Sequence, residues 1–258
     1  MAITAAMVKD LREMTGAGMM DCKKALNETN GNMDEAVEFL RKNGQAKAEK
    51  KASRVAAEGV VNVAVDGDTK AAIVEVNSET DFVAKNEKFQ NYVAEVAKQV
   101  LTTEATDVDA FMEEKWQGDA AKTVKDALVE QVAVIGENLK IRRFEKVSAD
   151  NGCVVPYIHG GGRIGVLVEA DTDVVNDEIK ETAVVNDTVK EALKNLAMQI
   201  AALNPKYVSD SEVSADYIAH EKEILMAQIN NDPKESQKPE KVKEGMIQGR
   251  IKKELKEI

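Results

Sequence analysis

The hydrophobic pattern of this chain changes its period near residue 59, and this change constrains the fold more than any other feature. Over residues 1–44, apolar side chains recur every three or four positions, which is typical of amphipathic helices. Over residues 59–77 the period becomes two, with Val61, Val63 and Val65 at alternate positions, which is typical of strands. Helical spacing returns in later segments, at residues 89–100, 124–135 and 189–203. The sequence therefore predicts a mixed α+β protein.

Residues 1–44 are predicted to form three short helices. Thr4 is a suitable N-cap for the first helix, and Asp21 is expected to begin the second. Gly44 is expected to close the third, and residues 45–58 to form a separate linker helix. The result is similar to a domain of the ubiquitin-associated type. A bundle this small has a marginal core, so we expect it to dock on a partner rather than to catalyse a reaction.

Two strand regions are predicted to form hairpins. The first contains an Asp-Gly-Asp turn signal at residues 66–68. The second runs over residues 139–170, and the three glycines at 160–162 link its last two strands. Residues 73–83 weakly resemble residues 166–175, because each has an apolar strand followed by a Thr-Asp pair. The sequence therefore predicts two related α+β subdomains with small antiparallel sheets.

Two charged amphipathic segments, residues 211–231 and 239–258, follow the second strand region. A short break between such helices favours an antiparallel helical hairpin, which we expect to protrude and bind something. The predicted organisation is a three-helix docking domain with its linker at 1–54, core subdomains at 55–140 and 141–208, and the hairpin with a final helix at 209–258.

The charge of the chain argues against nucleic acid as a direct partner. The formal net charge is −11, whereas phosphate binding needs a concentrated positive surface. One basic cluster does occur, at Lys47, Lys50, Lys51 and Arg54. It fits either the solvated face of a linker helix or a contact with an acidic protein surface.

The sequence also argues against membrane insertion and secretion. No apolar run approaches the ~20 residues that span a bilayer, and the N-terminus lacks the features of a signal peptide. The cysteines, Cys22 and Cys153, lie far apart without the spacing of a metal or redox motif. We therefore expect a cytoplasmic protein with reduced thiols and no membrane association.

Residues 80–88 lie between a strand pattern and a helix pattern, and two interpretations of them are open. In the first, Phe82 fills the local core and Asp81 caps the following turn. In the second, Asp81 and Phe82 are presented outward as a charged, rigid tip. The pattern of the residues alone does not separate the two.

Covalent catalysis has little support in the sequence. The metalloprotease, phosphate-loop and nucleophile-elbow motifs are missing from it, and its histidines are His159 and His220. Cys153 and His159 could form a nucleophile pair, yet Cys153 lies in a valine-rich strand whose alternation favours burial. A thiol or metal hydrolase is therefore only an alternative.

Several motifs together resemble the elongation factor Ts family. The first signature of that family resembles residues 8–26, VKDLREMTGAGMMDCKKAL, and the second resembles residues 75–86, EVNSETDFVAKN. Shorter matches follow in the same order, with IGEN at 135–138, IRR at 141–143, YIHG at 157–160 and RIGVL at 163–167. The resemblance covers nearly the whole chain.

The resemblance implies a guanine-nucleotide exchange factor for elongation factor Tu, with no cofactor and no covalent chemistry. It implies that Thr80, Asp81, Phe82 and Val83 form a wedge, with Phe82 entering the GTPase near its magnesium site. The docking residues that it implies are Arg12, Met19, Met20 and Lys23 in the helical domain, Ile135 and Gly136 beside the wedge, His159 in the second subdomain and Met246 in the last helix.

Two further expectations come from the resemblance. Family members usually continue beyond the position of Ile258 with a strand-bearing segment, so we expect an exposed sheet edge in the second subdomain. The helical hairpin is expected either to support a homodimer or only to protrude. A binding adaptor that recognises ubiquitin-like partners is the alternative function, although an adaptor has no need of the wedge motif.

Overall fold

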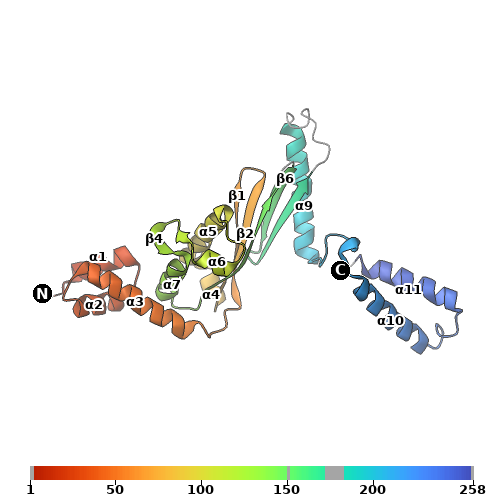
Figure 1. Cartoon of the computed structure of the whole chain (residues 1–258), viewed down its shortest axis with the longest axis horizontal. Helices are drawn as coiled ribbons and strands as arrows, with labels where there is room; N and C mark the ends of the chain where they lie inside the picture. The colour runs from red at the N-terminus through yellow and green to blue at the C-terminus, as the bar shows by residue number, and fades with distance from the viewer. Residues whose placement is uncertain (1–2, 150–151, 172–182, 257–258) are drawn as a thin grey trace. The chain divides into compact units, whose positions relative to one another are not determined.

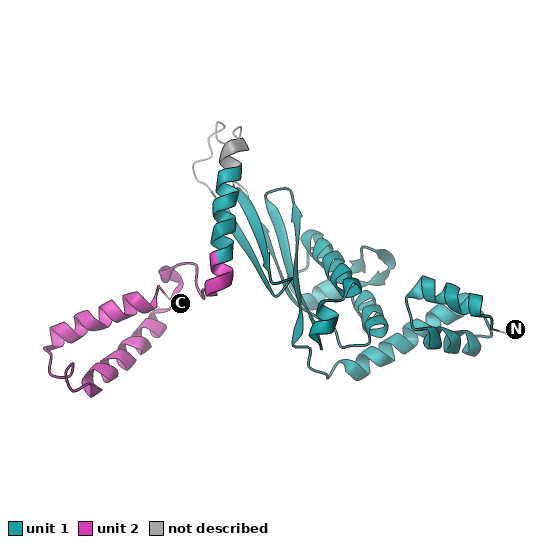
Figure 2. Cartoon of the chain, turned by 180° about the vertical axis from the view of Figure 1, so that it is seen from behind, with its two compact units in different colours: residues 1–198 teal, residues 199–258 magenta. Residues whose placement is uncertain are grey.

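The structure, a computed structural model, describes residues 3–149, 152–171 and 183–256. The chain divides into two compact units, Met1–Met198 and Gln199–Ile258 (Figure 2). The elements are helices and small antiparallel sheets, with three helices first along the chain, so the α+β class is confirmed (Figure 1). None of the helices in the described ranges is long and apolar enough to cross a membrane.

The first helices are α1 (Ala5–Thr15), α2 (Met19–Glu28) and α3 (Met33–Lys51). Thr4 caps α1 as predicted, because its hydroxyl accepts a hydrogen bond from the Met7 N–H at 3.3 Å. The helices pack around an apolar core of their own. Its fully buried members are Leu11, Cys22, Ala25, Leu26 and Ala36.

The predicted start of the second helix is wrong by two residues. α2 begins at Met19, after Gly18, and Asp21 lies in its first turn. An aspartate there is stabilised by the positive end of the helix dipole, which explains why it marks the region without being the first residue. Asp21 also forms an ion pair with Lys47 of α3 at 2.9 Å.

The predicted end of the third helix is also wrong. α3 runs through Gly44 without a break to Lys51, so residues 45–58 do not form a helix of their own. Gly44 is buried, and a Cβ atom there would lie 3.5 Å from the side chain of Ala133 in α7 (Val124–Ile135). This glycine therefore lies inside α3, where the helix packs against α7, and it does not end the helix.

An antiparallel sheet of strand order β1-β2-β5 lies at the centre of the first unit. β1 (Glu58–Asp66) and β2 (Lys70–Ser78) form the predicted hairpin, with Gly67 in its turn at φ 59°. β5 (Lys140–Ser148) pairs with the other edge of β2. Helix α5 (Glu87–Thr102) packs on this sheet, and the core includes the fully buried side chains of Val74, Val76, Phe89, Val93, Val96, Val100 and Val124.

Several short elements connect these strands and helices. The sequence does not predict them, because segments of two to five residues are too short to show a period. They are α4 (Asp81–Ala84), α6 (Val108–Met112), β3 (Lys115–Trp116) and β4 (Asp119–Thr123).

The second strand region of the sequence divides between two sheets. β5 joins the first sheet, whereas β6 (Gly152–His159) and β7 (Ile164–Asp171) pair with each other as a separate two-stranded sheet in the part of the chain that is described. The predicted glycine turn joins β6 to β7, with all of residues 160–162 at positive φ. The carbonyl of Gly162 accepts a hydrogen bond from the N–H of Val61 in β1 at 2.7 Å.

Helix α9 (Ala183–Leu203) ends at the predicted Asn-Pro stop, where Asn204 has a φ of 50°. The weak internal repeat is only partly visible. Its first copy covers β2 and α4, and the Thr172-Asp173 pair of its second copy lies outside the described residues.

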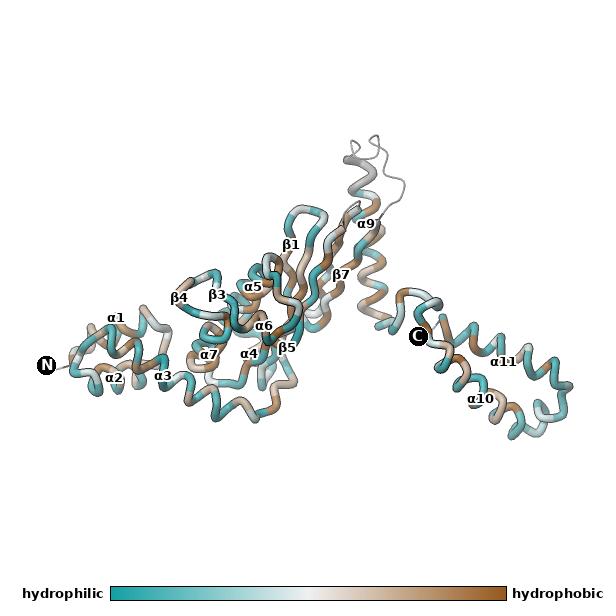
Figure 3. Tube along the Cα trace, in the orientation of Figure 1, coloured by the Kyte–Doolittle hydropathy of each residue, from teal (hydrophilic) through white to brown (hydrophobic). Residues whose placement is uncertain are grey.

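The second unit contains α10 (Ala215–Asn231) and α11 (Glu240–Glu254), after the short 3-10 helix η1 (Asp210–Glu212). Apolar and hydrophilic positions alternate along both longer helices (Figure 3). The two helices pack against each other through the buried side chains of Leu225, Ile229, Ile247 and Ile251.

Candidate functional site

Phe82, the aromatic residue of the segment at 80–88, is exposed. It lies on α4, one turn of helix between β2 and α5, and its relative accessibility is 82%. The expectation that Phe82 fills the core is therefore wrong. Positions two apart in a helix lie about 200° apart around its axis. Because Ala84 is buried and Val83 packs on the core, Phe82 is turned outward.

Asp81 does not cap the turn either; Thr80 does. The Thr80 hydroxyl accepts a hydrogen bond from the Val83 N–H at 3.4 Å. Asp81 instead occupies the first turn and pairs with Lys85 at 2.7 Å. The hydrogen bond from Lys85 is the main cause that lowers the pKa of the Asp81 carboxyl. The tip is therefore a charged pair beside an exposed aromatic ring.

A carboxylate from the end of α7 holds the start of α4. Glu137 accepts hydrogen bonds from the backbone N–H groups of Glu79 at 3.0 Å and Thr80 at 3.1 Å. Its other oxygen accepts one from the Thr80 hydroxyl at 2.6 Å. The side chain of Glu137 thus bonds to two consecutive residues that directly precede α4.

A second carboxylate makes the opposite connection. Glu79 accepts a hydrogen bond from the backbone N–H of Asn138 at 2.6 Å, and it lies 3.5 Å from the Arg54 guanidinium. The Asn138 side chain donates to the Arg54 carbonyl at 2.8 Å, and Lys51 donates to the Gly136 carbonyl. We call Glu79 and Glu137, with these partners, the carboxylate clamp.

The clamp also explains part of the basic cluster. Lys47 pairs with Asp21, Lys51 donates to the Gly136 carbonyl after α7, and the Arg54 guanidinium lies 3.5 Å from Glu79 before α4. All three cations contact groups of the same chain, which is consistent with a structural role for this segment. The alternative, a contact of this cluster with an acidic protein surface, is not tested by these intrachain contacts.

Ile135 and Gly136 lie at the C-terminal end of α7, next to the clamp. Ile135 is partly buried against the main core. Gly136 ends the helix as predicted, at φ 90°, with its N–H bonded to the Val132 carbonyl at 3.0 Å. The structure therefore brings the expected wedge, residues 80–83, and this expected support together through Glu137.

The expected docking residues of the helical domain are exposed around the α1–α2 turn. Met19 and Met20 have relative accessibilities of 58% and 75%, and Arg12 and Lys23 are exposed as well. Met14 at the end of α1 is also exposed. Flexible, apolar methionine side chains in such a position can adapt to a partner surface.

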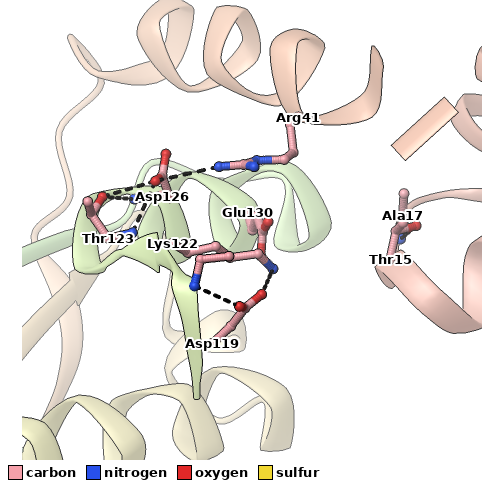
Figure 4. A network of polar contacts seen from close by, with 9 residues as sticks. Thr15, Ala17, Arg41, Asp119, Lys122, Thr123, Asp126 and Glu130 are labelled. Carbon is pink, nitrogen blue, oxygen red and sulfur yellow. Dashed lines mark hydrogen bonds and ion pairs between the residues drawn. The ribbon is translucent and has the colours of Figure 1, made fainter. Parts of the chain in front are cut away.

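Helix α3 of this domain is attached to α7 by a polar network as well as by Gly44. Arg41 lies 3.6 Å from Asp126, whose carboxylate also accepts the Thr123 N–H in the capping box of α7 (Figure 4). Beside it, Lys122 pairs with Glu130 at 2.8 Å and with Asp119 at 3.3 Å (Figure 4).

His159 and Met246 lie apart from the clamp in the chain. His159 is exposed at the end of β6, where its Nδ1 lies 2.9 Å from the Tyr157 hydroxyl. Met246 lies on α11 in the second unit, partly buried against the apolar cluster of α10 and α11. Its sulfur is 3.6 Å from the Lys238 ammonium.

The described side chains give the nucleophile hypothesis no support. Burial raises the pKa of the Cys153 thiol, which disfavours the reactive thiolate. Burial likewise raises the pKa of Cys22. Within the described ranges, no group of three or more His, Cys, Asp or Glu side chains is arranged to hold a metal ion.

Glu79 and Glu137 lie within two of the sequence motifs, but the motifs do not predict the role of their carboxylates. One signal could have found Glu137, because it follows directly after the glycine that ends α7. The C-terminus of a helix is negative, so an anion is unfavourable there unless other donors compensate it. A glutamate in that position therefore indicates nearby N–H groups, which here belong to Glu79 and Thr80.

Exposed phenylalanine and methionine side chains on structured supports are typical of protein-binding surfaces. A family model described as "Elongation factor TS" matches residues 79–258. Proteins named Elongation factor Ts from Clostridium novyi (strain NT) and Clostridioides difficile (strain 630) are 49% and 51% identical over 257 residues, which is 99% of this chain and 79% of each relative. That of Clostridium tetani (strain Massachusetts / E88) is 50% identical over 99% of this chain and 80% of its own length.

The chain belongs to the elongation factor Ts family, whose members act as nucleotide-exchange factors for elongation factor Tu. The resemblance inferred from the sequence motifs is thereby confirmed.

Proposed function

We propose that this chain accelerates GDP release from elongation factor Tu by inserting Asp81 and Phe82 as a wedge near the magnesium and phosphate site of the GTPase. The observation that carries the proposal is the exposure of Phe82, at 82%, on a one-turn helix whose start is tied to α7. An exposed aromatic ring on a held support is costly to leave in water and well placed to enter a partner.

The wedge need not touch the nucleotide to release it. In a GTPase, backbone N–H groups, a lysine and magnesium hold the phosphates of GDP. Displacing the side chains that position the metal weakens GDP binding by some factor α. The same factor weakens the exchange factor when nucleotide is bound, because the coupling free energy, −RT ln α, is reciprocal. Incoming GTP or GDP therefore releases the exchange factor.

The remaining contact residues form the docking part of the proposal. Arg12, Met19, Met20 and Lys23 bind the GTPase domain, and Ile135 and Gly136 support the contact made by Thr80, Asp81, Phe82 and Val83. His159 binds a different domain of elongation factor Tu, and Met246 of α11 makes a further GTPase contact. Exposure supports the assignments to Met19, Met20 and His159.

The same proposal includes the organisation and setting of the protein. The first three helices act as a ubiquitin-associated-like docking domain with its linker at 1–54, followed by two related core subdomains at 55–140 and 141–208. Residues 209–258 hold a protruding helical hairpin that can support a homodimer. The protein works in the cytoplasm, by binding and distortion without covalent chemistry or a cofactor, and without direct contact to nucleic acid.

The test is stopped-flow release of a fluorescent GDP from elongation factor Tu of the same source. The chain at catalytic amounts is expected to accelerate release. Phe82→Ala is expected to lower the maximal rate about tenfold, equivalent to about 1.4 kcal/mol, with a smaller change in the half-saturating concentration. Most of the docking surface is intact in this variant.

The matched control is Val65→Ala, which removes an apolar side chain that is 51% exposed at the end of β1. It is expected to leave the rate unchanged. An unchanged rate in Phe82→Ala would remove the wedge from the proposal. Binding without any acceleration by the unsubstituted chain would favour the adaptor function instead.

A further inference from the structure

We propose that Glu137 is a positioning residue for nucleotide exchange, which acts by holding the turn that presents Phe82. The inference rests on the proposed function, since it assigns the residue that makes the wedge rigid. Glu137 itself is partly buried and its carboxylate faces the backbone before α4. It therefore acts through the wedge and not through a contact of its own with the GTPase.

The hydrogen bonds of Glu137 fix the direction of α4. Both N–H groups that it accepts belong to residues 79 and 80, and the Thr80 hydroxyl donates to it at 2.6 Å. Hydrogen bonds to an ionised carboxylate are the shorter and stronger class. The same Thr80 oxygen caps α4 at Val83. The start of the helix is thus held at the residue two positions before Phe82.

The opposite bonds make the connection two-sided. Glu79 accepts the Asn138 N–H at 2.6 Å, while Glu137 accepts the Glu79 N–H at 3.0 Å. Each of the two loops therefore gives a carboxylate to the backbone of the other. Such crossed bonds resist both sliding and rotation, so α4 and the end of α7 are expected to move as one body.

Rigidity of this kind matters for an exchange factor. A wedge that is disordered before binding must lose conformational entropy on insertion, and a flexible one yields instead of displacing its target. Loss of the clamp is therefore expected to lower the maximal rate of GDP release more than it weakens binding through the docking surfaces.

The experiment uses the full chain with Glu137→Gln and measures fluorescent GDP release from elongation factor Tu. The amide keeps the shape of the side chain but turns one acceptor oxygen into a donor. The maximal rate is expected to fall about fivefold to tenfold, whereas the half-saturating concentration changes less than twofold. A loss seen only in the half-saturating concentration would overturn the positioning role.

Glu114→Gln is the matched control. The Thr103 hydroxyl donates to the Glu114 carboxylate, as the Thr80 hydroxyl donates to Glu137. This threonine–glutamate bond joins the end of α5 to the segment after α6. Both glutamates are partly buried. The control is expected to retain full exchange, and urea denaturation of both variants measures how much stability each substitution removes. Equal loss of exchange in both variants would mean that general destabilisation is the cause, and would overturn the proposal.

A double-mutant cycle with Phe82→Ala separates this inference from the proposed function. If Glu137 acts through Phe82, adding Glu137→Gln to Phe82→Ala lowers the rate no further. Independent, multiplicative losses would overturn the positioning role and leave the wedge intact. If Phe82→Ala alone has no effect, the wedge itself is removed.

Glu79→Gln supplies a second variant in case Glu137→Gln does not fold, as judged by circular dichroism. It weakens the opposite bond, to the Asn138 N–H. The same loss of maximal rate and the same lack of additivity with Phe82→Ala are expected. Full exchange by folded Glu79→Gln would show that the crossed carboxylates do not position the wedge.

Discussion

The conformation of residues 80–85, which expose Phe82 and the Asp81–Lys85 pair, depends on the contacts of single side chains. Val83 and Ala84 face the core, Phe82 faces solvent, and the N–H and the hydroxyl of Thr80 both donate to Glu137. Asp81 and Lys85 lie one turn apart and pair at 2.7 Å across the outer face of α4. Each of these arrangements is local, and together they leave one large apolar group in water.

The Asp81–Lys85 pair carries a prediction about acid sensitivity. Because Lys85 lowers the pKa of Asp81 below its usual 3.8, the pair favours the folded turn above that pH, and this contribution is lost as the pH falls through the lowered value. Lys85→Met is expected to return the pKa of Asp81 toward 3.8. Carboxyl-carbon NMR titration measures it, and an unchanged value would contradict the pair.

At the scale of elements, α3 shows how a glycine can mislead. Glycine lowers helix propensity, so the sequence places a helix end at Gly44. In the structure Gly44 is buried beside Ala133 and Val129 of α7, and the helix continues to Lys51. Tertiary packing has overridden the local preference.

Gly44→Ala is therefore expected to stabilise the protein. The added Cβ would meet Ala133 at 3.5 Å and Val129 at 3.9 Å, which are ordinary contacts, and alanine favours a helix interior by about 1 kcal/mol. Urea denaturation measures the change. Gly162→Ala is expected to destabilise the protein instead. The φ of Gly162 is +96°, and an added Cβ would lie 3.0 Å from Val60. A loss of stability in Gly44→Ala would contradict the packing explanation.

Elements that depend on neighbouring residues could be predicted from the sequence, whereas pairings between distant segments could not. Three features depend only on neighbouring residues, so the local sequence is enough to predict them. They are the α1 cap at Thr4, the α7 end at Gly136 and the glycine turn at 160–162. The pairing of β5 with β2 depends on a partner more than sixty residues away. Alternation predicts a strand but does not name its partner.

The candidate site follows the same division. The resemblance to the family led to Phe82, and its outward direction could not be decided from hydrophobicity, because an apolar side chain near an element end is usually buried. Within the clamp, the bonds of the Glu79 and Glu137 carboxylates to N–H and hydroxyl groups join residues 57 to 59 positions apart in the chain. Such bonds leave no periodic trace in a sequence.

At the scale of the whole molecule, the two compact units have separate cores. The first contains the sheet and Trp116, which is the chain's single tryptophan, and the second contains the cluster around Ile229. Separate cores of this kind are expected to unfold in separate steps.

Ile229→Ala tests this independence. Ile229 is fully buried between α10 and α11, so its truncation is expected to cost about 2–5 kcal/mol in the second unit. The urea transition seen by far-ultraviolet circular dichroism should gain an earlier phase, whereas the midpoint seen by Trp116 fluorescence stays unchanged. A parallel shift of both signals would show one cooperative unit.

The unbroken course of α3 has a mechanical consequence. A helix of 19 residues is about 28 Å long and stiff over that length. Its first turns belong to the core of the N-terminal helices, and Lys51 at its far end bonds to Gly136 in the loop after α7. Arg54, just beyond the helix, lies 3.5 Å from Glu79 in the segment before α4. If the proposed function holds, this unbroken helix is expected to couple a displacement at Met19 and Met20 to the support of Phe82, because α3 has no break at Gly44.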